Sequence, residues 1–387
     1  MPNSAKGSAT LVLVATPAEV REAAGHAAGY AEVARRGQRL LAAELEERLM
    51  AAGASIESLP WRDRAGQPFH WGRWFAPAAR DATRRAGAAG RRVEAIGYAG
   101  AGAVALLSDD GLATLLGAVP GEAVGNNRFS ADAFVVAGDV GQLSLALEAL
   151  EASATDNAAL RHLQAAGVAV RDLGATPFAR FDVDTPLDLA LLRLAARLPG
   201  TRPLGPALES FLEASRLADD RALDVPHLEE IGAVMRDSTA ELVVAGRVPA
   251  SAWAYLETET ACRVRCFIEE RGMRSARDGR PRSVLAGLLD RSSPAQLVTD
   301  LAALGDAVIW DTRVLMAAVG GSAEASAWPP EGERFASDYG DHARIETAWL
   351  RELTQAAADA SVPFLCGGHA LVSDGLHILV DTAWLGR

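Results

Sequence analysis

Short apolar runs alternate with longer amphipathic stretches along the first half of the chain. The apolar runs predict buried strands at residues 11–16, 55–59, 91–98, 126–137, 168–174 and 181–184. The amphipathic stretches predict helices at residues 35–51, 109–117 and 156–166. Strands that alternate with helices are typical of an α/β sheet that has helices on both faces.

The same pattern restarts in the second half of the chain. The run LPGTRPLGP at residues 198–206 is rich in Pro and Gly, which indicates a domain boundary. Beyond it, four apolar runs predict strands at residues 240–246, 262–270, 306–312 and 362–369. We therefore expect an α/β domain at residues 1–198 and a second, smaller α/β domain at residues 207–387.

Composition narrows the class of protein. The 387 residues are 49% hydrophobic and 6% aromatic, and three of them are cysteines. The formal net charge of −12 argues against nucleic acid as a partner, because phosphates would be repelled. No apolar run approaches the roughly 18 residues of a membrane span, and the N-terminal apolar run is too short for a signal peptide. We expect a cytoplasmic protein with neither disulfides nor a membrane partner.

Two carboxylates end the last predicted strand of the first half. The period of a strand places Asp182 and Asp184 on one face, and Thr185 and Pro186 suit the first turn of a following helix. Two carboxylates held this close are stable mainly when a cation such as Mg²⁺, an arginine or a helix N-terminus lies beside them. The alternative is that Asp182 ends the strand in solvent while Asp184 caps the helix.

Arginines follow three of the predicted strands in the second half. Carboxyl ends of parallel strands gather at one edge of a sheet, where Arg247, Arg271 and Arg313 would form an anion site together with His369. In the alternative interpretation, the arginines pair with neighbouring carboxylates and His369 bonds to backbone. Cys262, Cys266 and Cys366 form a possible zinc set with His369, although buried thiols are also common as small apolar groups.

Glycines and aromatic residues supply two further candidate features. Gly97, Gly100 and Gly102 follow a predicted strand, and glycines at such a place let backbone amides approach an anion. Their order departs from the dinucleotide fingerprint, so NAD(P) is not expected. Residues 61–75 interleave aromatics with arginines, which would stack on a nucleobase, contact a second subunit of a homodimer, or pack on their own domain.

One element resembles a known group of families. The run DNAALRHLQAAGVAV at residues 156–170, followed by FDVDTPLDLALL at 181–192, resembles the carboxyl end of nucleotidyltransferases related to 2-phospholactate guanylyltransferase and molybdenum-cofactor guanylyltransferase. These families have a Rossmann-like glycosyltransferase-A-type fold and transfer a nucleotide from an NTP to a small or phosphorylated acceptor. The resemblance covers residues 10–196 and implies that Asp182 and Asp184 bind Mg²⁺ as the catalytic carboxylates.

The resemblance also implies a substrate site. GNNRFSADAFVV at residues 125–136 resembles the strand after the acceptor region, which would place Asn126, Asn127, Arg128 and Ser130 near a ligand. Two departures are visible: the first strand lacks a compact glycine-rich phosphate loop after it, and residues 100–112 lack the family's third metal carboxylate within AGAGA.

Three functions therefore remain open from the sequence. The first is Mg²⁺-dependent transfer of a nucleotide from an NTP to a small anionic metabolite. The second is binding of a nucleotide or phosphometabolite without transfer, which the two departures favour. The third is sugar-nucleotide glycosyl transfer, which shares the fold and also uses closely spaced aspartates.

Overall fold

The chain forms two compact units. The computed structural model describes residues 8–17, 26–61, 69–174, 176–269 and 280–385. Unit 1 comprises Met1–Glu19 and Gln38–Asp182, and unit 2 comprises Val20–Gly37 and Val183–Arg387. Unit 2 is thus the longer of the two, whereas the sequence predicted a smaller second domain. Its first residues after the division form a helix that packs on other helices of unit 2, which is why the division falls before residue 198.

Unit 1 contains a six-stranded mixed sheet. Its strands are β1 (Ser8–Thr16), β2 (Ser55–Pro60), β3 (Arg92–Ala99), β4 (Glu122–Gly125), β5 (Ala133–Ala137) and β6 (Ala169–Asp172). The order is β2-β1-β3-β5-β4-β6, and β5 runs antiparallel to both its neighbours, β3 and β4. The helices are α1 (Ala28–Ala51, of which unit 1 holds the part from Gln38), α2 (Trp71–Ala88), α3 (Asp109–Leu116), α4 (Val140–Glu151) and α5 (Ala159–Ala165), with a 3₁₀ turn η1 (Asp156–Ala158).

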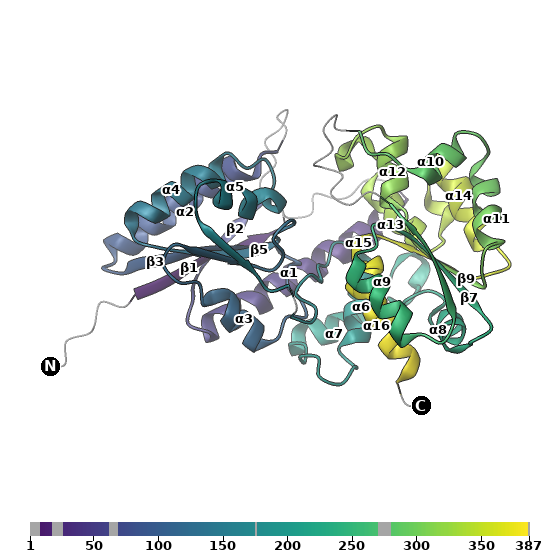
Figure 1. Cartoon of the computed structure of the whole chain (residues 1–387), viewed down its shortest axis with the longest axis horizontal. Helices are drawn as coiled ribbons and strands as arrows, with labels where there is room; N and C mark the ends of the chain where they lie inside the picture. Colours follow the sequence, from purple (N-terminus) through teal and green to yellow (C-terminus); the bar gives the residue numbers. More distant parts are fainter. Residues whose placement is uncertain (1–7, 18–25, 62–68, 175, 270–279, 386–387) are drawn as a thin grey trace. The chain divides into compact units, whose positions relative to one another are not determined.

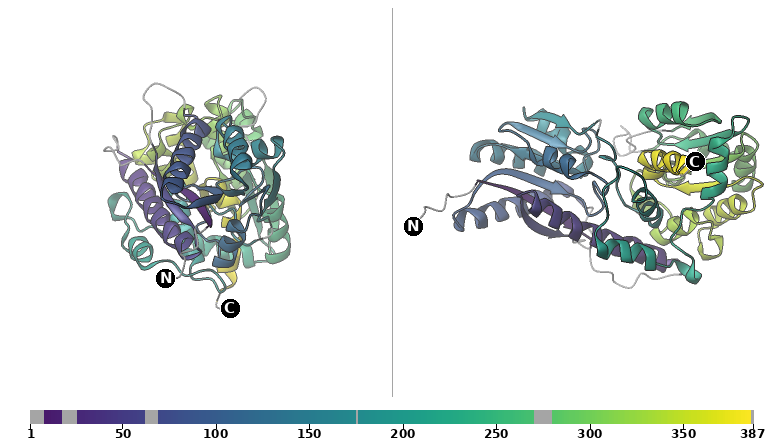
Figure 2. Two further views of the ribbon diagram at one scale, coloured as in Figure 1. Left: turned by 90° about the vertical axis from the view of Figure 1, so that its left-hand side faces the viewer. Right: turned by 90° about the horizontal axis from the view of Figure 1, so that it is seen from below.

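Helices cover both faces of this sheet, and side chains that alternate along β1 serve the two resulting cores. Leu11 and Leu13 belong to the core formed with α2, α4 and α5. Val12 and Val14 belong to the core formed with α1 and α3. Figure 1 and the right-hand view of Figure 2 show the sheet between these two layers. Burial on both faces explains why β1 is a continuous apolar run.

Helix α2 accounts for most of the aromatic segment. Trp71 and Phe75 are buried and stacked with ring centroids 4.8 Å apart, and Tyr98 of β3 and Phe134 of β5 contact them edge-on. These aromatics therefore pack on their own unit, which is one of the interpretations left open by the sequence. Residues 62–68 lie outside the described part of the chain.

Unit 2 contains a four-stranded parallel sheet. Its strands are β7 (Glu241–Gly246), β8 (Arg263–Ile268), β9 (Ala307–Asp311) and β10 (Phe364–Gly367), in the order β10-β9-β7-β8. The helices are α6 (Pro186–Ala195), α7 (Pro206–Ala214), α8 (Leu228–Arg236), α9 (Ala250–Glu259), α10 (Val284–Leu289), α11 (Pro294–Ala302), α12 (Arg313–Val319), α13 (Glu331–Asp338), α14 (Ala348–Ala358), α15 (His369–Val372) and α16 (Asp374–Trp384). Short 3₁₀ turns are η2 (Ala218–Asp220), η4 (Ala325–Ala327) and η5 (His342–Arg344).

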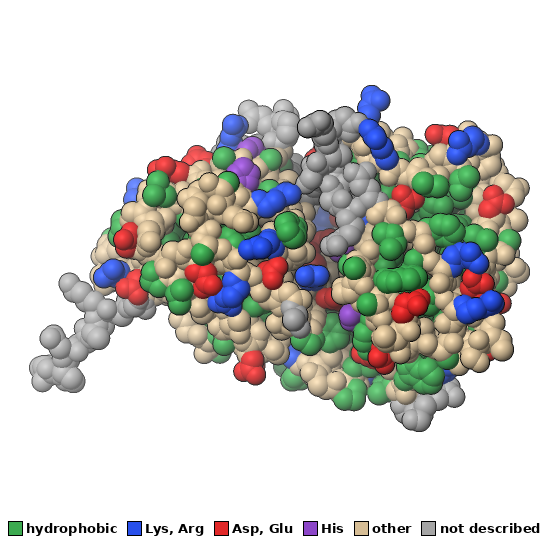
Figure 3. All heavy atoms as spheres, in the orientation of Figure 1, with side chains coloured by type: hydrophobic (Ala, Val, Ile, Leu, Met, Phe, Trp, Pro, Cys, Tyr) green, Lys and Arg blue, Asp and Glu red, His purple; other side chains and the backbone are tan. Residues whose placement is uncertain are grey.

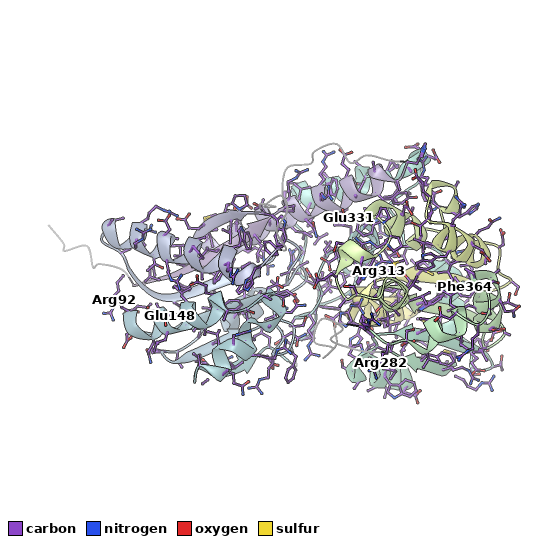
Figure 4. All side chains as sticks on the ribbon, turned by 90° about the horizontal axis from the view of Figure 1, so that it is seen from above. Arg92, Glu148, Arg282, Arg313, Glu331 and Phe364 are labelled. Atoms are coloured by element: carbon purple, nitrogen blue, oxygen red, sulfur yellow. The ribbon has the colours of Figure 1, made fainter. Side chains whose placement is uncertain are left out.

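Two groups of helices pack on the sheet of unit 2. Helix α16 contacts α6, α8 and α9, while α11 contacts α10 and α14, and Figure 1 shows these groups on opposite sides of the sheet. The first turns of α1 also belong to this unit, where Arg35 pairs with Glu331 at 2.5 Å. Glu331 is labelled in Figure 4. The chain is therefore an α/β protein, as its alternating pattern predicted.

In both sheets, the strands that follow the first strand are added first on one side of it and then on the other. In unit 1, β2 and β3 lie on opposite sides of β1, and in unit 2, β8 and β9 lie on opposite sides of β7. All of these neighbours are parallel, and in unit 1 the helices that follow β1 and β3, α1 and α3, pack on the same face of the sheet. In open α/β sheets, ligands bind in the crevice at such a reversal, beyond the carboxyl ends of the strands.

One predicted strand is absent. Residues 181–184 form no ladder with any described strand, although Phe181 and Val183 are fully buried. The alternating apolar side chains that predicted a strand are instead buried from an irregular segment that leads into α6. Thr185 and Asp188 form a reciprocal capping box there, and Pro186 begins the helix.

Candidate functional site

A glycine-rich turn follows β3 at the reversal of unit 1. Residues 101–106 form consecutive turns between β3 and α3, and residues 102–107 are buried. Val104 has a φ of 50°, a left-handed conformation that a β-branched side chain rarely adopts. Such a conformation costs on the order of 1–3 kcal/mol and is retained where the surroundings fix it, often at ligand sites.

Two backbone amides of this turn have no hydrogen-bond partner among the described residues. Gly100 donates its amide to the carbonyl of Asp132 at 2.8 Å, and Ala103 donates to the carbonyl of Gly100 at 3.2 Å. Within the described part of the chain, the amides of Gly102 and Val104 make no hydrogen bond, although both residues are buried. Buried amides are nearly always paired, and unpaired amides close together in a turn suit an anion.

Asn126 is joined to this turn through Asp132. The Asn126 side-chain oxygen accepts hydrogen bonds from the amides of Asp132 and Ala133, at 3.0 and 3.1 Å. The Asp132 carbonyl in turn accepts the Gly100 amide. The structure therefore brings two predicted site residues, Asn126 and Gly100, to one place. Asn126 itself is buried and spans the start of the β4–β5 connection.

A polar cluster that the sequence did not indicate lies around Asp132. With its amide oriented to satisfy its neighbours, Asn157 donates to both Asp156 and Asp132, at 3.2 and 3.3 Å. The Tyr98 hydroxyl donates to Asp156 at 3.3 Å. Burial and the nearby Asp156 carboxylate raise the pKa of Tyr98 well above its usual value, which keeps its hydroxyl protonated. The only sequence signal was the polarity of these residues, because separate loops bring them together.

The neighbouring predicted residues have structural partners. Asn127 accepts the Phe129 amide at 3.2 Å, which fixes the turn between β4 and β5. Arg128 donates to the carbonyl of Val170 at 2.7 Å, and its amide donates to Asp172 at 3.3 Å. These bonds fasten the turn to the edge strand β6. Ser130 is half-buried in the same turn.

The two carboxylates of the FDVDTP element fall on either side of the division between the units. Asp182 is the last residue of unit 1, and Asp184 is part of unit 2. The amides of Asp184 and Thr185 both donate to one carboxyl oxygen of Asp188, at 3.0 and 2.8 Å. Burial, and then the charge of Asp184, raise the pKa of Asp188 to about 7. The other oxygen of Asp188 is buried without a hydrogen-bond partner in the described structure.

In unit 2, the arginines at the carboxyl edge of the sheet are engaged with buried carboxylates. Arg247 follows β7 and donates through Nε and a terminal nitrogen to Asp311, at 2.6 and 3.0 Å. Gly246 has a φ of +123°, and a Cβ on it would lie 2.4 Å from the Cβ of Asp311. Glycine at this position therefore allows β7 and β9 to approach closely enough for the pair to form.

Arg313 forms a second pair below the surface (Figure 4). Its two terminal nitrogens donate to the two carboxyl oxygens of Asp338, at 2.9 and 2.5 Å, and both residues are buried. Burial alone would lower the pKa of Arg313, but the adjacent Asp338 carboxylate reverses that effect and raises it. Likewise, burial alone would raise the pKa of Asp311, but Arg247, His369 and Arg313 hold it below its usual value.

These pairs match the second interpretation of the arginines, in which neighbouring carboxylates hold them. The His369 ring is close enough to Asp311 to lower its pKa, so it lies at this edge of the sheet. Arg271 lies outside the described residues. The sheet thus gathers Arg247, Arg313 and His369 as expected, together with the acidic partners that neutralise the arginines.

The cysteines and His369 do not form a zinc site. Cys262 and Cys266 lie at β8, and Cys366 lies on β10, at the opposite edge of the four-stranded sheet. Strands are about 4.8 Å apart, so three spacings separate these thiols by far more than a shared metal ion allows. Burial raises the pKa of Cys266 and of Cys366 to about 12, as expected of thiols that pack as apolar groups.

No metal-binding cluster and no membrane-spanning helix adds a site in the described structure. Among the described residues, no group of three or more His, Cys, Asp or Glu side chains is placed to hold a metal ion. No helix in the described ranges is both long and apolar enough to cross a membrane. On the face drawn in Figure 3, basic and acidic side chains are interspersed instead of forming a patch of one sign.

The chain was also compared with known proteins. No protein-family model, curated protein sequence or solved structure matches it.

Proposed function

We propose that the protein binds a nucleoside triphosphate at the glycine-rich turn of unit 1 and transfers its nucleotidyl group to a small anionic acceptor. One observation carries the proposal: within the turn at residues 100–106, the buried amides of Gly102 and Val104 have no partner in the described structure, and the turn follows β3 at the reversal of strand order. A phosphate accepts hydrogen bonds from such amides, and the reversal is where open α/β sheets bind nucleotides.

Two further features support a nucleotidyltransferase. The FDVDTP element at residues 181–186 resembles the metal-binding element of that group, and the proposed fold of unit 1 is the glycosyltransferase-A type. The cluster of Asp132, Asp156 and Asn157 adds carboxylate and amide groups beside the turn, where this chain lacks the third carboxylate of the family pattern. The acceptor or ribose would contact this cluster.

Mg²⁺ is the ion that such a site implies. It is usually held by one or two carboxylates together with substrate phosphates and water, and Asp182 and Asp184 have that donor chemistry. When bound, the ion would neutralise the charge of the triphosphate. The residues of the turn would bind and orient the phosphates, so that an acceptor oxygen attacks the α-phosphorus while the bond to pyrophosphate breaks.

Hydrogen exchange tests where the nucleotide binds. The full chain is titrated with each NTP, with and without Mg²⁺, and amide exchange is followed by mass spectrometry. We expect an NTP to slow exchange in peptides that cover residues 100–107, because their free amides become hydrogen-bonded. Binding that leaves exchange in this turn unchanged would place the nucleotide elsewhere and refute the site.

Product analysis tests the reaction. Pyrophosphate release in the presence of an acceptor marks nucleotidyl transfer, whereas nucleoside diphosphate release from a sugar nucleotide marks glycosyl transfer. Protection of the turn without either product marks a binding protein. We expect Asp182→Asn to abolish pyrophosphate release while the fold is retained, and the exposed Asp110→Asn to behave as wild type. Equal activity in wild type and Asp182→Asn would exclude a catalytic role for this carboxylate.

A further inference from the structure

Unit 2 contains a cavity that the proposed function does not use. Its volume is about 380 Å³, and it lies between the second half of α6 and the first turn of α8. Pockets of about 300–1,000 Å³ are typical of small-molecule sites. The lining residues are Ala190, Arg193, Leu194, Arg197, Asp224, Val225, Leu228, Glu229 and Glu230.

One pair of charges in the lining is internally neutralised. Arg193 donates to Asp224 and, at 3.4 Å, to the carbonyl of Leu212, so its guanidinium is fixed by the protein. Burial and the neighbouring Arg197, which lies in the turn just after α6, lower the pKa of Arg193. The Arg193–Asp224 pair therefore forms a neutral wall of the cavity.

The remaining charges of the lining have no partners. In the described structure, the side chains of Arg197, Glu229 and Glu230 form no hydrogen bond or ion pair. Arg197 and the two glutamates line one cavity, yet none of their charged atoms approach within the 4.0 Å of an ion pair. The cavity thus presents one positive group and two negative groups, held apart from one another.

We propose that this cavity binds a cationic α-amino acid, such as lysine or arginine. Such a ligand carries one carboxylate and two positive groups, which complements the one positive and two negative groups of the lining. Its carboxylate would pair with Arg197, and its α-ammonium and side-chain cation would pair with Glu229 and Glu230. Its aliphatic chain would lie along Ala190, Leu194, Val225 and Leu228.

The alternatives fit less well because they satisfy fewer groups. A diamine makes no contact with Arg197, and a dicarboxylate makes none with the two glutamates and is repelled by them. A neutral α-amino acid satisfies only one glutamate. A basic α-amino acid is the smallest ligand of ordinary metabolism that has all three charges in one molecule with a flexible apolar stem.

Calorimetric titration of the full chain tests the proposal. The probes are L-lysine, L-arginine, cadaverine, which has two ammonium groups but no carboxylate, and glutarate. We expect L-lysine or L-arginine to bind at least tenfold more tightly than cadaverine, because the carboxylate contact to Arg197 is charge-assisted. Glutarate should not bind.

Variants locate the site. Arg197→Gln should weaken L-lysine binding about tenfold and leave cadaverine binding unchanged, while the double variant Glu229→Gln, Glu230→Gln should weaken both. All three residues are exposed, so the variants should fold, and Arg291→Gln, an exposed arginine of the same unit, is the matched control. The absence of heat with both amino acids at millimolar concentration, equal binding of cadaverine and lysine, or unchanged lysine binding in Arg197→Gln would each overturn the proposal. None of these outcomes depends on nucleotide binding in unit 1.

Discussion

The buried carboxyl group of Asp188 should make the stability of unit 2 depend on pH near neutrality. The side chain is 1% exposed, and one of its oxygens is buried without a hydrogen-bond partner in the described structure. Burial and the charge of Asp184 raise its pKa from an ordinary value of 3.8 to about 7. Folded unit 2 therefore binds this proton more tightly than the unfolded chain does.

The sign and size of the effect follow from linkage. Because the folded pKa is raised, the contribution to stability is fully present below pH 3.8 and is lost as the pH rises through about 7. At about 1.4 kcal/mol per pKa unit, the free energy of unfolding should fall by about 4 kcal/mol across that interval. Asp188→Asn keeps an oxygen to accept the amides of Asp184 and Thr185 but cannot ionise, so it should remove this fall.

Hydrogen exchange of β7 and β9 peptides measures the free energy of unfolding of unit 2 itself. Wild type and Asp188→Asn are compared at each pH from 4 to 8 in EDTA, so that intrinsic exchange rates cancel. We expect the variant to match wild type near pH 4, to exceed its stability progressively between about pH 4 and pH 7, and to keep a constant excess above that. Asp359→Asn, an exposed aspartate of the same unit, is the control. A difference between Asp188→Asn and wild type that stays constant over this range would refute the buried-carboxyl argument.

Three other substitutions test the packing. Arg313→Met leaves Asp338 buried without its partner and should lower the free energy of unfolding by about 3–5 kcal/mol in urea. The double variant with Asp338→Leu should recover part of that loss. Additive effects of the two substitutions would show that the pair is uncoupled. Gly246→Ala should destabilise unit 2 by at least about 1–3 kcal/mol, because its Cβ would collide with Asp311, and a neutral result would contradict the close approach. Trp71→Ala should cost about 3–5 kcal/mol in the unfolding of unit 1, and a loss below about 1 kcal/mol would exclude a core role.

The strands were largely predictable from the sequence, because a strand that is buried on both faces of a sheet consists of a continuous run of apolar residues. All four strands of unit 2 lie within the predicted runs, and β1, β2 and β3 of unit 1 match theirs to within a few residues. The segment at residues 181–184 alternates buried apolar and polar side chains, as a strand with one buried face does. It forms no ladder with a described strand, because its apolar side chains fill the core without a neighbouring strand. Alternating burial is typical of a strand that packs one face on a core, but an irregular chain also produces it over four residues.

The site was predictable only in part, because partners come from distant loops. Gly100 and Asn126 were identified from sequence, but Asp132, which connects them, carried no local signal. The second-half arginines were likewise identified without their partners. Arg313 meets Asp338 from 25 residues away, and a local pattern cannot encode that pairing. Spacing along one strand or helix predicts a shared face, whereas contacts between loops depend on the fold.

The two reversals of strand order differ in the charge that a ligand would meet. At the reversal of unit 1, free backbone amides carry only partial positive charge, and an anion gains hydrogen bonds there without displacing another group. At the reversal of unit 2, Arg247 already holds Asp311, so an anion would have to break a short bidentate pair and leave a buried carboxylate alone. Breaking such a pair typically costs about 3–5 kcal/mol, which would weaken anion binding by at least a hundredfold. We therefore propose that the phosphates of a nucleotide bind in unit 1, and that in unit 2 a charged metabolite binds in the cavity between α6 and α8, where Arg197, Glu229 and Glu230 have no partner in the described structure.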